Sequence, residues 1–191
     1  MTHELDELAA QVGEGKNLSH PPLHLWHPEL SGDIDIVIRS DGSWWHEGDQ
    51  IKRAPLVNLF ASILRREDDG DYYLLTPVEK WRIKVDFLPL LIVDFDLQHA
   101  GSDQQVLSVV TNTGRDYVVG PQFPLFIPAQ ASVPGATPDL AGIPAVQLDY
   151  GLAALLGRPV WYRLMEGFEA YGVETKEGFS LLSSGEHYIL G

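Results

Sequence analysis

Cysteine is absent from the 191 residues of this chain. Without thiols the protein cannot form disulfide bonds, thiolate zinc sites or a cysteine nucleophile. The chain also has no apolar run of about 18 residues, the length that a membrane-spanning helix requires. Its first residues, Met1 to Leu8, are acidic and amphipathic, which is not the pattern of a signal peptide. We therefore expect a soluble, cytoplasmic protein with no membrane partner.

Positive charge is scarce, because 13 Lys and Arg residues stand against 27 Asp and Glu residues and give a formal net charge of −14. Nucleic-acid-binding surfaces need a clustered excess of basic residues, so we expect no nucleic-acid partner. The basic residues are nevertheless concentrated between positions 51 and 84, which hold seven of them against five acidic residues. They are Lys52, Arg53, Arg65, Arg66, Lys80, Arg82 and Lys84. This segment is where an anionic small molecule would bind first.

Three blocks of the sequence resemble three later blocks, and they occur in the same order. Residues 37–48 match 109–120, residues 51–55 match 156–160, and residues 74–81 match 181–188. Ordered similarity of this kind predicts a duplicated unit, with two related halves that face each other across a cleft.

Hydrophobic spacing predicts the elements of the first half. Alternating Ile34, Ile36 and Ile38 indicate a half-buried strand, and Asp41-Gly42 is the turn of a hairpin. An apolar helical face then follows Pro55, and strands are expected at 80–87 and 88–97, the latter as the seam between the halves. Residues 3–12 have the spacing of a short amphipathic helix.

The second half is predicted to repeat this plan with an insertion. We expect a hairpin over 106–120, a helix over 152–168 that is kinked at Arg158-Pro159, and a final hairpin over 179–190. The insertion, 121–144, contains six of the 13 prolines and could pack on the other half or on a second subunit, so a homo-oligomer stays open. The expected fold class is α+β with two small related domains. The predicted boundaries are an amino-terminal helix and connector at 1–20, a first domain at 21–97 and a second at 98–191.

Several motifs of the first half resemble the bacterial domain-of-unknown-function family 1285. They are Gly32-Asp33-Ile34-Asp35-Ile36, Asp41-Gly42-Ser43-Trp44, Gly48, Ile51-Lys52-Arg53, Leu59-Phe60-Ala61-Ser62-Ile63-Leu64 and Leu75-Thr76-Pro77-Val78-Glu79-Lys80. The resemblance covers most of residues 21–191. It implies a two-domain α+β protein with a repeated motif, no established activity, and a proposed nucleotide-like ligand in the interdomain cleft with a signalling role. No catalytic residues come with it.

The second copy departs from these motifs, because Trp44 and His46 have Asp116 and Val118 as their counterparts. The second half could therefore keep the scaffold and lose ligand contacts.

Arg53 and Arg158 are the first candidate ligand-binding residues, because they occupy matching positions at the starts of the two long helical segments. A guanidinium beside the amides of a helix start can hold a phosphate or carboxylate. The competing reading is a structural ion pair with Glu79 or Glu186, which also correspond.

Other candidates come from the strands. Lys80, with Arg82 and Lys84, forms a basic stripe that either attracts an anion or is a solvated strand face. Trp44 and Trp45 could stack a base or belong to the core. Thr76 and Ser183 could donate hydrogen bonds to the ligand.

Metal sites have weak support in the sequence. His20, His24, His27 and Glu29 lie in a proline-rich connector that would not align them as ligands. The pairs Asp33/Asp35 and Asp94/Asp96 could hold Mg²⁺ but are better read as solvated strand faces. No metal site is therefore predicted, and the sequence does not indicate whether a cofactor binds.

Three hypotheses remain. The first is a noncatalytic, regulatory binding protein for a small anionic, nucleotide-like molecule. The second is a metal-dependent enzyme that handles phosphate, and the third is a protein interaction module without a ligand.

Overall fold

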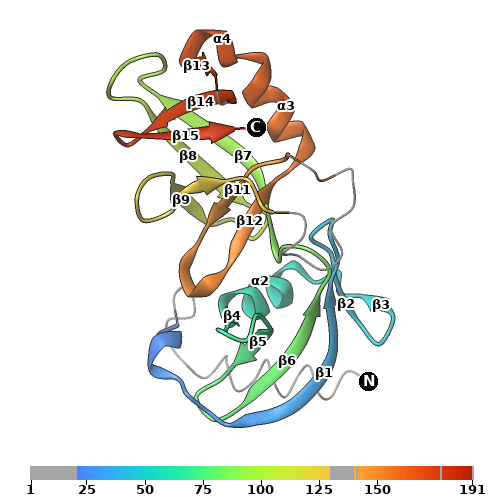
Figure 1. Ribbon diagram of the computed structural model, residues 1–191. Helices are drawn as coiled ribbons and strands as arrows, with labels where there is room; N and C mark the ends of the chain where they lie inside the picture. Colours follow the sequence, from blue (N-terminus) through green and yellow to red (C-terminus); the bar gives the residue numbers. More distant parts are fainter. Residues whose placement is uncertain (1–20, 130–139, 141, 177, 191) are drawn as a thin grey trace. The chain divides into compact units, whose positions relative to one another are not determined.

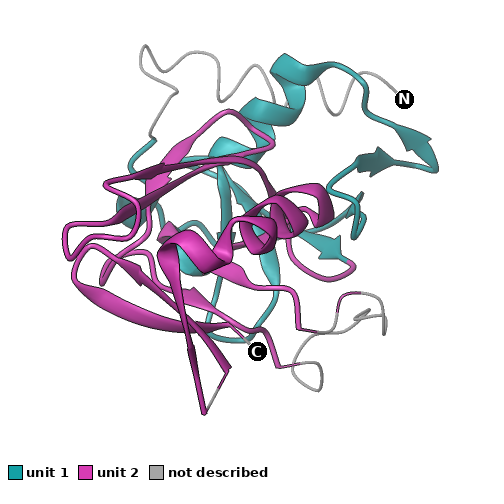
Figure 2. Ribbon diagram, turned by 90° about the horizontal axis from the view of Figure 1, so that it is seen from above, with its two compact units in different colours: residues 1–85, 150–152 teal, residues 86–149, 153–191 magenta. Residues whose placement is uncertain are grey.

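The structure is a computed structural model that describes residues 21–129, 140, 142–176 and 178–190. The chain forms two compact units of mixed α and β structure, coloured separately in Figure 2. Unit 1 contains the chain up to Val85 together with Tyr150–Leu152, and unit 2 contains Asp86–Asp149 and the chain from Ala153 onward. The two-domain α+β class predicted from the sequence is confirmed.

Unit 1 is built on a six-stranded sheet with the order β3-β2-β1-β6-β5-β4. Its strands are β1 (Leu30–Ile38), β2 (Trp44–His46), β3 (Asp49–Gln50), β4 (Leu64–Arg66), β5 (Tyr72–Leu75) and β6 (Lys80–Val85), and a 3₁₀ turn, η1 (Leu23–Leu25), precedes them. Consecutive strands pair antiparallel within β1–β2–β3 and within β4–β5–β6, whereas β1 and β6 form a central parallel pair. Figure 1 shows β1 and β6 curving together along their length.

Helix α2 (Ala54–Ser62) covers unit 1's core. It begins after Arg53, whose backbone is extended, and Pro55 lies in the first turn, where its missing N–H costs nothing. Phe60 is fully buried and stacks on Trp44 of β2, with ring centroids 6.2 Å apart. The predicted helix lies where expected and ends at Ser62, because the residues that follow enter β4 and pair with β5.

Unit 2 contains a second six-stranded sheet with the order β10-β11-β12-β7-β8-β9. Its strands are β7 (Leu90–Gln98), β8 (Val106–Thr111), β9 (Asp116–Val118), β10 (Leu125–Phe126), β11 (Ala145–Gln147) and β12 (Ala153–Leu156), with η4 (Asp149–Gly151) between the last two. Here β7 and β12 form the central parallel pair. The strand predicted at 88–97 therefore belongs to unit 2, and the boundary lies earlier in the chain than expected.

The remainder of unit 2 is two helices and a small sheet. Helices α3 (Arg158–Glu166) and α4 (Phe168–Tyr171) are followed by the antiparallel strands β13 (Gly172–Thr175), β14 (Gly178–Ser183) and β15 (Glu186–Leu190). The prediction of a helix over all of 152–168 was wrong at its start. Residues 153–156 are buried throughout and pair with both neighbours as β12, and the helix begins only at Arg158.

The matching sequence blocks adopt matching local structures in different sheet positions. The turns after Val37 and Val109 have the same hydrogen bonds, at 2.9 Å from Arg39 N to Ser43 O and from Thr111 N to Arg115 O. The first hairpin, however, is β1–β2, which includes one of the two central strands of its sheet, whereas the second is β8–β9, which includes an edge strand. Likewise β6 joins the unit 1 sheet, but β15 lies in the separate small sheet.

The six-stranded sheets do share one strand order: in each, two three-stranded meanders join through the first and last strands. By strand order, β1 and β2 of unit 1 correspond to β7 and β8 of unit 2, whereas the matching sequence blocks lie in β1–β2 and β8–β9. The blocks that resemble each other in sequence therefore do not occupy equivalent strands.

The helix predicted at 3–12 and most of the proline-rich insertion lie outside the described residues. Within the insertion, β10 and the residues from 142 to 144 are described.

Candidate functional site

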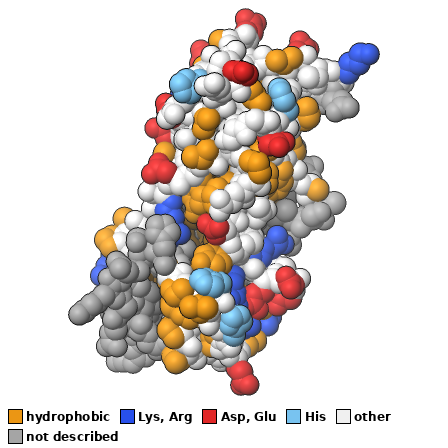
Figure 3. Space-filling model, turned by 90° about the vertical axis from the view of Figure 1, so that its left-hand side faces the viewer, with side chains coloured by type: hydrophobic (Ala, Val, Ile, Leu, Met, Phe, Trp, Pro, Cys, Tyr) orange, Lys and Arg blue, Asp and Glu red, His pale blue; other side chains and the backbone are white. Residues whose placement is uncertain are grey.

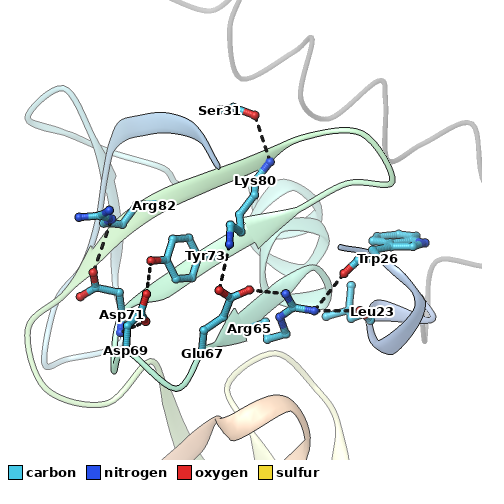
Figure 4. A network of polar contacts seen from close by, with 10 residues as sticks. All are labelled: Leu23, Trp26, Ser31, Arg65, Glu67, Asp69, Asp71, Tyr73, Lys80 and Arg82. Carbon is cyan, nitrogen blue, oxygen red and sulfur yellow. Dashed lines mark hydrogen bonds and ion pairs between the residues drawn. The ribbon is translucent and has the colours of Figure 1, made fainter. Parts of the chain in front are cut away.

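A row of polar side chains crosses four strands of the unit 1 sheet. Arg65 on β4 is opposite Tyr73 on β5, Tyr73 is opposite Arg82 on β6, and Arg82 is opposite Asp33 on β1. Residues directly opposite on neighbouring strands project from the same face of the sheet. Together with Glu67, Asp69, Asp71 and Lys80 they form what we call the charge network (Figure 4).

Glu67 is the centre of the charge network. Its Oε2 accepts a hydrogen bond from Lys80 Nζ at 3.0 Å, and its Oε1 accepts one from Arg65. The three side chains are each about one fifth exposed. Burial of Glu67 tends to raise its pKa, but the hydrogen bonds from Arg65 and Lys80 outweigh that effect and leave the pKa below its ordinary value. Glu67 is therefore held as a carboxylate.

Tyr73 is the buried aromatic residue that the charged side chains of the network contact. It is 2% exposed, Lys80 Nζ lies 4.8 Å from the centre of its ring, and its hydroxyl donates to Asp69 Oδ2 at 2.7 Å. Burial and the hydrogen bond to Asp69 raise the pKa of Tyr73 to about 12. The same hydrogen bond lowers the pKa of Asp69. Tyr73 is thus a neutral donor and has no basic form near neutral pH.

The charge network also holds the turn η1, which precedes β1, against the sheet of unit 1. Arg65 Nη1 donates to the backbone carbonyls of Leu23 and Trp26, each at 3.1 Å. Figure 4 shows these carbonyls and Glu67 around one guanidinium. Three of the five N–H donors of this guanidinium are therefore used within unit 1. The arrangement fixes η1 onto β4 and is structural.

The basic stripe predicted at Lys80, Arg82 and Lys84 is mostly neutralised within unit 1. Lys80 pairs with Glu67, and Arg82 Nε lies 3.4 Å from Asp33 and 3.5 Å from Asp71. Lys80 is therefore corrected from a ligand contact to a member of the charge network. This compensation could not be predicted from local sequence, because the acidic partners lie in other parts of the unit 1 sheet and its turns.

The two candidate tryptophans have different environments. Trp44 is 1% exposed and packs on Phe60, so of the two alternatives predicted for it, stacking on a base or a place in the core, the structure shows the core. Trp45 points to the other face of β2, is half-buried and donates from its indole N–H to Ser43 Oγ at 2.8 Å. Only Trp45 retains the partial exposure that stacking requires.

The predicted hydroxyl donors are both fully buried. Thr76 Oγ1 accepts hydrogen bonds from the backbone N–H groups of Val78 and Glu79 within its own turn. Ser183 Oγ accepts from Leu107 N at 2.9 Å and donates to Val119 O at 2.7 Å. Their burial corrects the prediction that they contact a ligand.

Glu79 was predicted as a ligand-site residue or as the structural partner of Arg53. Its Oε2 accepts a hydrogen bond from Trp81 Nε1 at 3.2 Å. Its backbone carbonyl accepts from Thr76 N at 2.9 Å. Both contacts stabilise the β5–β6 turn.

Arg53 and Arg158 are exposed at equivalent places in two similar helices. Arg53 is the residue before α2, and Arg158 is the first residue of α3. Each helix has nine residues, a proline in its first turn, no acidic residue there and no side-chain cap. The positive end of each helix dipole is therefore reinforced by an arginine. Lys52, also exposed, adds a second positive charge beside Arg53.

The paired carboxylates do not form metal sites. Asp33 lies against Arg82, and Asp94 pairs with Arg163 of α3. In the part of the chain that the structure describes, no group of three or more His, Asp and Glu side chains could hold a metal ion. His24 and His27 are exposed, and His20 lies outside the described residues. The described helices also include none that is long and apolar enough to cross a membrane.

The comparisons with known proteins agree with this two-unit architecture. Residues 21–87 match the family model "Domain of unknown function (DUF1285), N-terminal domain". Residues 89–190 match the model "Protein of unknown function (DUF1285), C-terminal domain". The chain belongs to the DUF1285 family. The boundary between the two models, near residue 88, coincides with the division between unit 1 and unit 2.

Two solved structures of the DUF1285 family are similar to this chain. A protein from Silicibacter pomeroyi DSS-3 is 36% identical, with a TM-score of 0.79, and the match covers 96% of this chain and 93% of that one. A protein from Shewanella baltica OS155 is 33% identical, with a TM-score of 0.51, and the match covers 70% of this chain and 91% of that one. No curated protein matches the sequence.

Proposed function

We propose that the protein binds a small anionic, nucleotide-like molecule and acts as a noncatalytic regulatory protein, with a role in signalling. The observation that supports this proposal is the exposed Lys52-Arg53 pair at the start of α2, a helix with no acidic residue in its first turn. The anion would pair with the guanidinium and with the positive end of the helix dipole.

Several other basic residues of segment 51–84 already contact groups within unit 1, which makes them weaker candidates for binding the anion. Arg65, Lys80 and Arg82 of the same segment are engaged by acidic partners. Arg66 Nε donates to the Gly70 carbonyl and its guanidinium lies over Tyr72. We assign Arg53 to the anion because it is exposed and lies immediately before the first turn of α2. Arg158, at the start of α3, is the second candidate and can be tested separately.

The proposal is tested by thermal shift and calorimetric titration with ATP, GTP, AMP and inorganic phosphate. A stabilising ligand should raise the melting temperature with its concentration. Arg53→Ala should then weaken binding about ten- to a hundredfold, because a charge-assisted contact contributes about 1.5–3 kcal/mol. Arg66→Ala removes the same charge from an exposed side chain of β4 and serves as the control, with unchanged affinity.

The outcome also separates binding from a structural role of Arg53. If Arg53→Ala lowers the free energy of unfolding by several kcal/mol, and a double mutant with Glu79→Ala shows a large coupling energy, the residue is structural and the proposal fails.

A metal-dependent phosphate-handling enzyme is the alternative that the same titrations address. Nucleotide turnover that requires Mg²⁺ would favour it, whereas binding without product supports the regulatory reading. If all of these anions leave the melting temperature unchanged, an interaction module without a ligand becomes the better description.

A further inference from the structure

A pocket of about 290 Å³ lies entirely within unit 2 and is distinct from the residues discussed above. It is bounded by the loop after β7, the end of α4 and one face of the small sheet. Its size is near the lower end of small-molecule sites, which have volumes of about 300–1,000 Å³.

The wall formed by the β7–β8 loop is held in place by a buried amide. Gln105 is 1% exposed, and its Nε2 donates to the carbonyls of Tyr171 at 3.2 Å and Leu182 at 2.8 Å. Its Oε1 accepts from Gly101 N at 2.6 Å. A single side chain thus ties the loop to β14 and to the end of α4. A pocket with fixed walls loses less entropy when a ligand binds.

Gly101 is required for this close approach. Its φ of +76° favours glycine, and a Cβ there would lie 2.8 Å from the carbonyl oxygen of Ala170. The loop therefore rests directly on the backbone at the end of α4, which closes one side of the pocket.

The residues that line the pocket include a hydroxyl–imidazole pair and an aspartate. Ser180 is 4% exposed and lies on β14, and its Oγ is 3.0 Å from Nδ1 of His187 on β15. Asp103, on the loop, has no hydrogen-bond or ion-pair partner among the described residues. The apolar part of the lining includes Leu182 and Val173, and Val173 is 58% exposed.

The electrostatics favour a cation over an anion. None of the described residues that line the pocket is Lys or Arg, whereas Asp103 is among them. Unit 2 as a whole is acidic, because residues 86–149 and 153–191 contain twelve Asp and Glu residues and four Lys and Arg residues. In the upper part of Figure 3, where unit 2 lies, red acidic side chains are scattered over the surface and basic ones are sparse. Such a field raises the local concentration of cations.

We propose that this pocket binds a small organic amine, with the ammonium group on Asp103, a polar group on the Ser180–His187 pair and the aliphatic part against Leu182 and Val173. A bare metal ion fits less well, because the described part of the chain has no cluster of three carboxylate or imidazole ligands. This site is made of unit 2 residues and would take a cation, whereas Arg53, proposed to hold an anion, belongs to unit 1.

The test is a titration of the ¹⁵N-labelled full-length protein, followed by amide chemical shifts. Three four-carbon probes of matched length differ in charge: 1,4-diaminobutane, 1,4-butanediol and succinate. Agmatine is added as a second amine. We expect saturable shifts at Gly101, Asp103 and Val173 with the amines, weaker shifts with the diol and none with succinate. Equal or stronger binding of succinate, or no saturable shift with either amine, would overturn the proposal.

Two variants test whether Asp103 binds the ammonium group of the amine. Asp103→Asn should weaken amine binding about fivefold, as expected for one ion pair near solvent. Asp116→Asn, at an exposed aspartate of β9 outside the pocket lining, is the matched control and should bind as the parent does. Unchanged affinity in Asp103→Asn would contradict the proposed ammonium site.

A reactive fluorophosphonate separates binding from hydrolysis, since a serine beside a histidine can also be a nucleophile. Covalent labelling of Ser180 would replace the binding proposal with a hydrolytic one. The absence of labelling, together with weaker amine binding in Ser180→Ala, supports the hydrogen-bonding role.

Discussion

The two units stabilise sheets of the same strand order with different kinds of polar contact. Unit 1 uses charged side chains on the face of β4–β6, with Glu67 between Arg65 and Lys80. In unit 2 the buried side chains that tie the small sheet to β8 and to the loop before it are neutral and bond to backbone; Gln105 and Ser183 are 1% and 0% exposed. The difference shows that one strand arrangement does not determine how its polar groups are satisfied, and it makes the two units respond differently to pH and mutation.

The largest expected effect is in unit 2. Gln105→Ala should lower the free energy of unfolding by about 2–4 kcal/mol, because it leaves three backbone groups without the partners they now have. Gln104→Ala, at the exposed neighbouring glutamine, is the control and should change stability by less than about 0.5 kcal/mol. Denaturant unfolding measures both, and hydrogen exchange should show the loss concentrated in β8, β13 and β14. A loss equally large in unit 1 would contradict the assignment.

A smaller effect is expected for Glu67→Gln in unit 1, about 1–2 kcal/mol. The substitution keeps the shape of the side chain but removes the charge that faces Arg65 and Lys80, which are both largely buried. Asp68→Asn, at the adjacent exposed aspartate, should be neutral. If Glu67→Gln were as harmless as Asp68→Asn in denaturant unfolding, the charge network would not stabilise unit 1.

The stability of Glu67→Gln should depend on pH less than the stability of the parent protein does at acid pH. The folded pKa of Glu67 is below its ordinary value of 4.5, so its contribution to stability is present above that pH and is lost as pH falls through the lower folded value. Hydrogen exchange between pH 6 and pH 3 should therefore show unit 1 weakening first. Glu67→Gln has no carboxylate to protonate at this position, so the loss of unit 1 stability that Glu67 causes at low pH should be absent from this variant.

The smallest effect is expected at the exposed ion pair of unit 2. Arg163→Ala removes the partner of Asp94, and both side chains are more than half exposed. Solvent screens such pairs, so the free energy of unfolding should change by no more than about 0.5 kcal/mol. A loss above 1 kcal/mol would mean that unit 2 also depends on charge pairs, and the contrast between the units would weaken. Thermal unfolding at low and high salt provides the measurement.

The sequence predicted the elements that depend on local periodicity. Alternating Ile34, Ile36 and Ile38 are all buried in β1, and the apolar spacing after Pro55 is that of α2. The prediction failed where tertiary pairing overrides local pattern. Residues 153–156 read as part of a helix, yet they form a strand because they lie between β7 and β11.

The candidate site was harder to predict for the same reason. Whether Lys80 is available depends on Glu67, and whether Trp44 is exposed depends on Phe60. Neither relation is local in sequence. The unit 2 pocket was missed altogether, because Gln105 and Ser180 are unremarkable residues until folding brings the β7–β8 loop against the small sheet.

The central parallel pair of unit 1 also governs the order in which the growing chain can assemble. Because β1 pairs with β6, the sheet cannot be completed on the ribosome until Val85 has emerged, and long-range pairing of this kind slows folding. Unit 1 then receives Tyr150–Leu152, where the buried Leu152 joins it and Gly151 packs against the backbone of Arg66. The first unit to be synthesised is therefore finished only after most of the second has been translated.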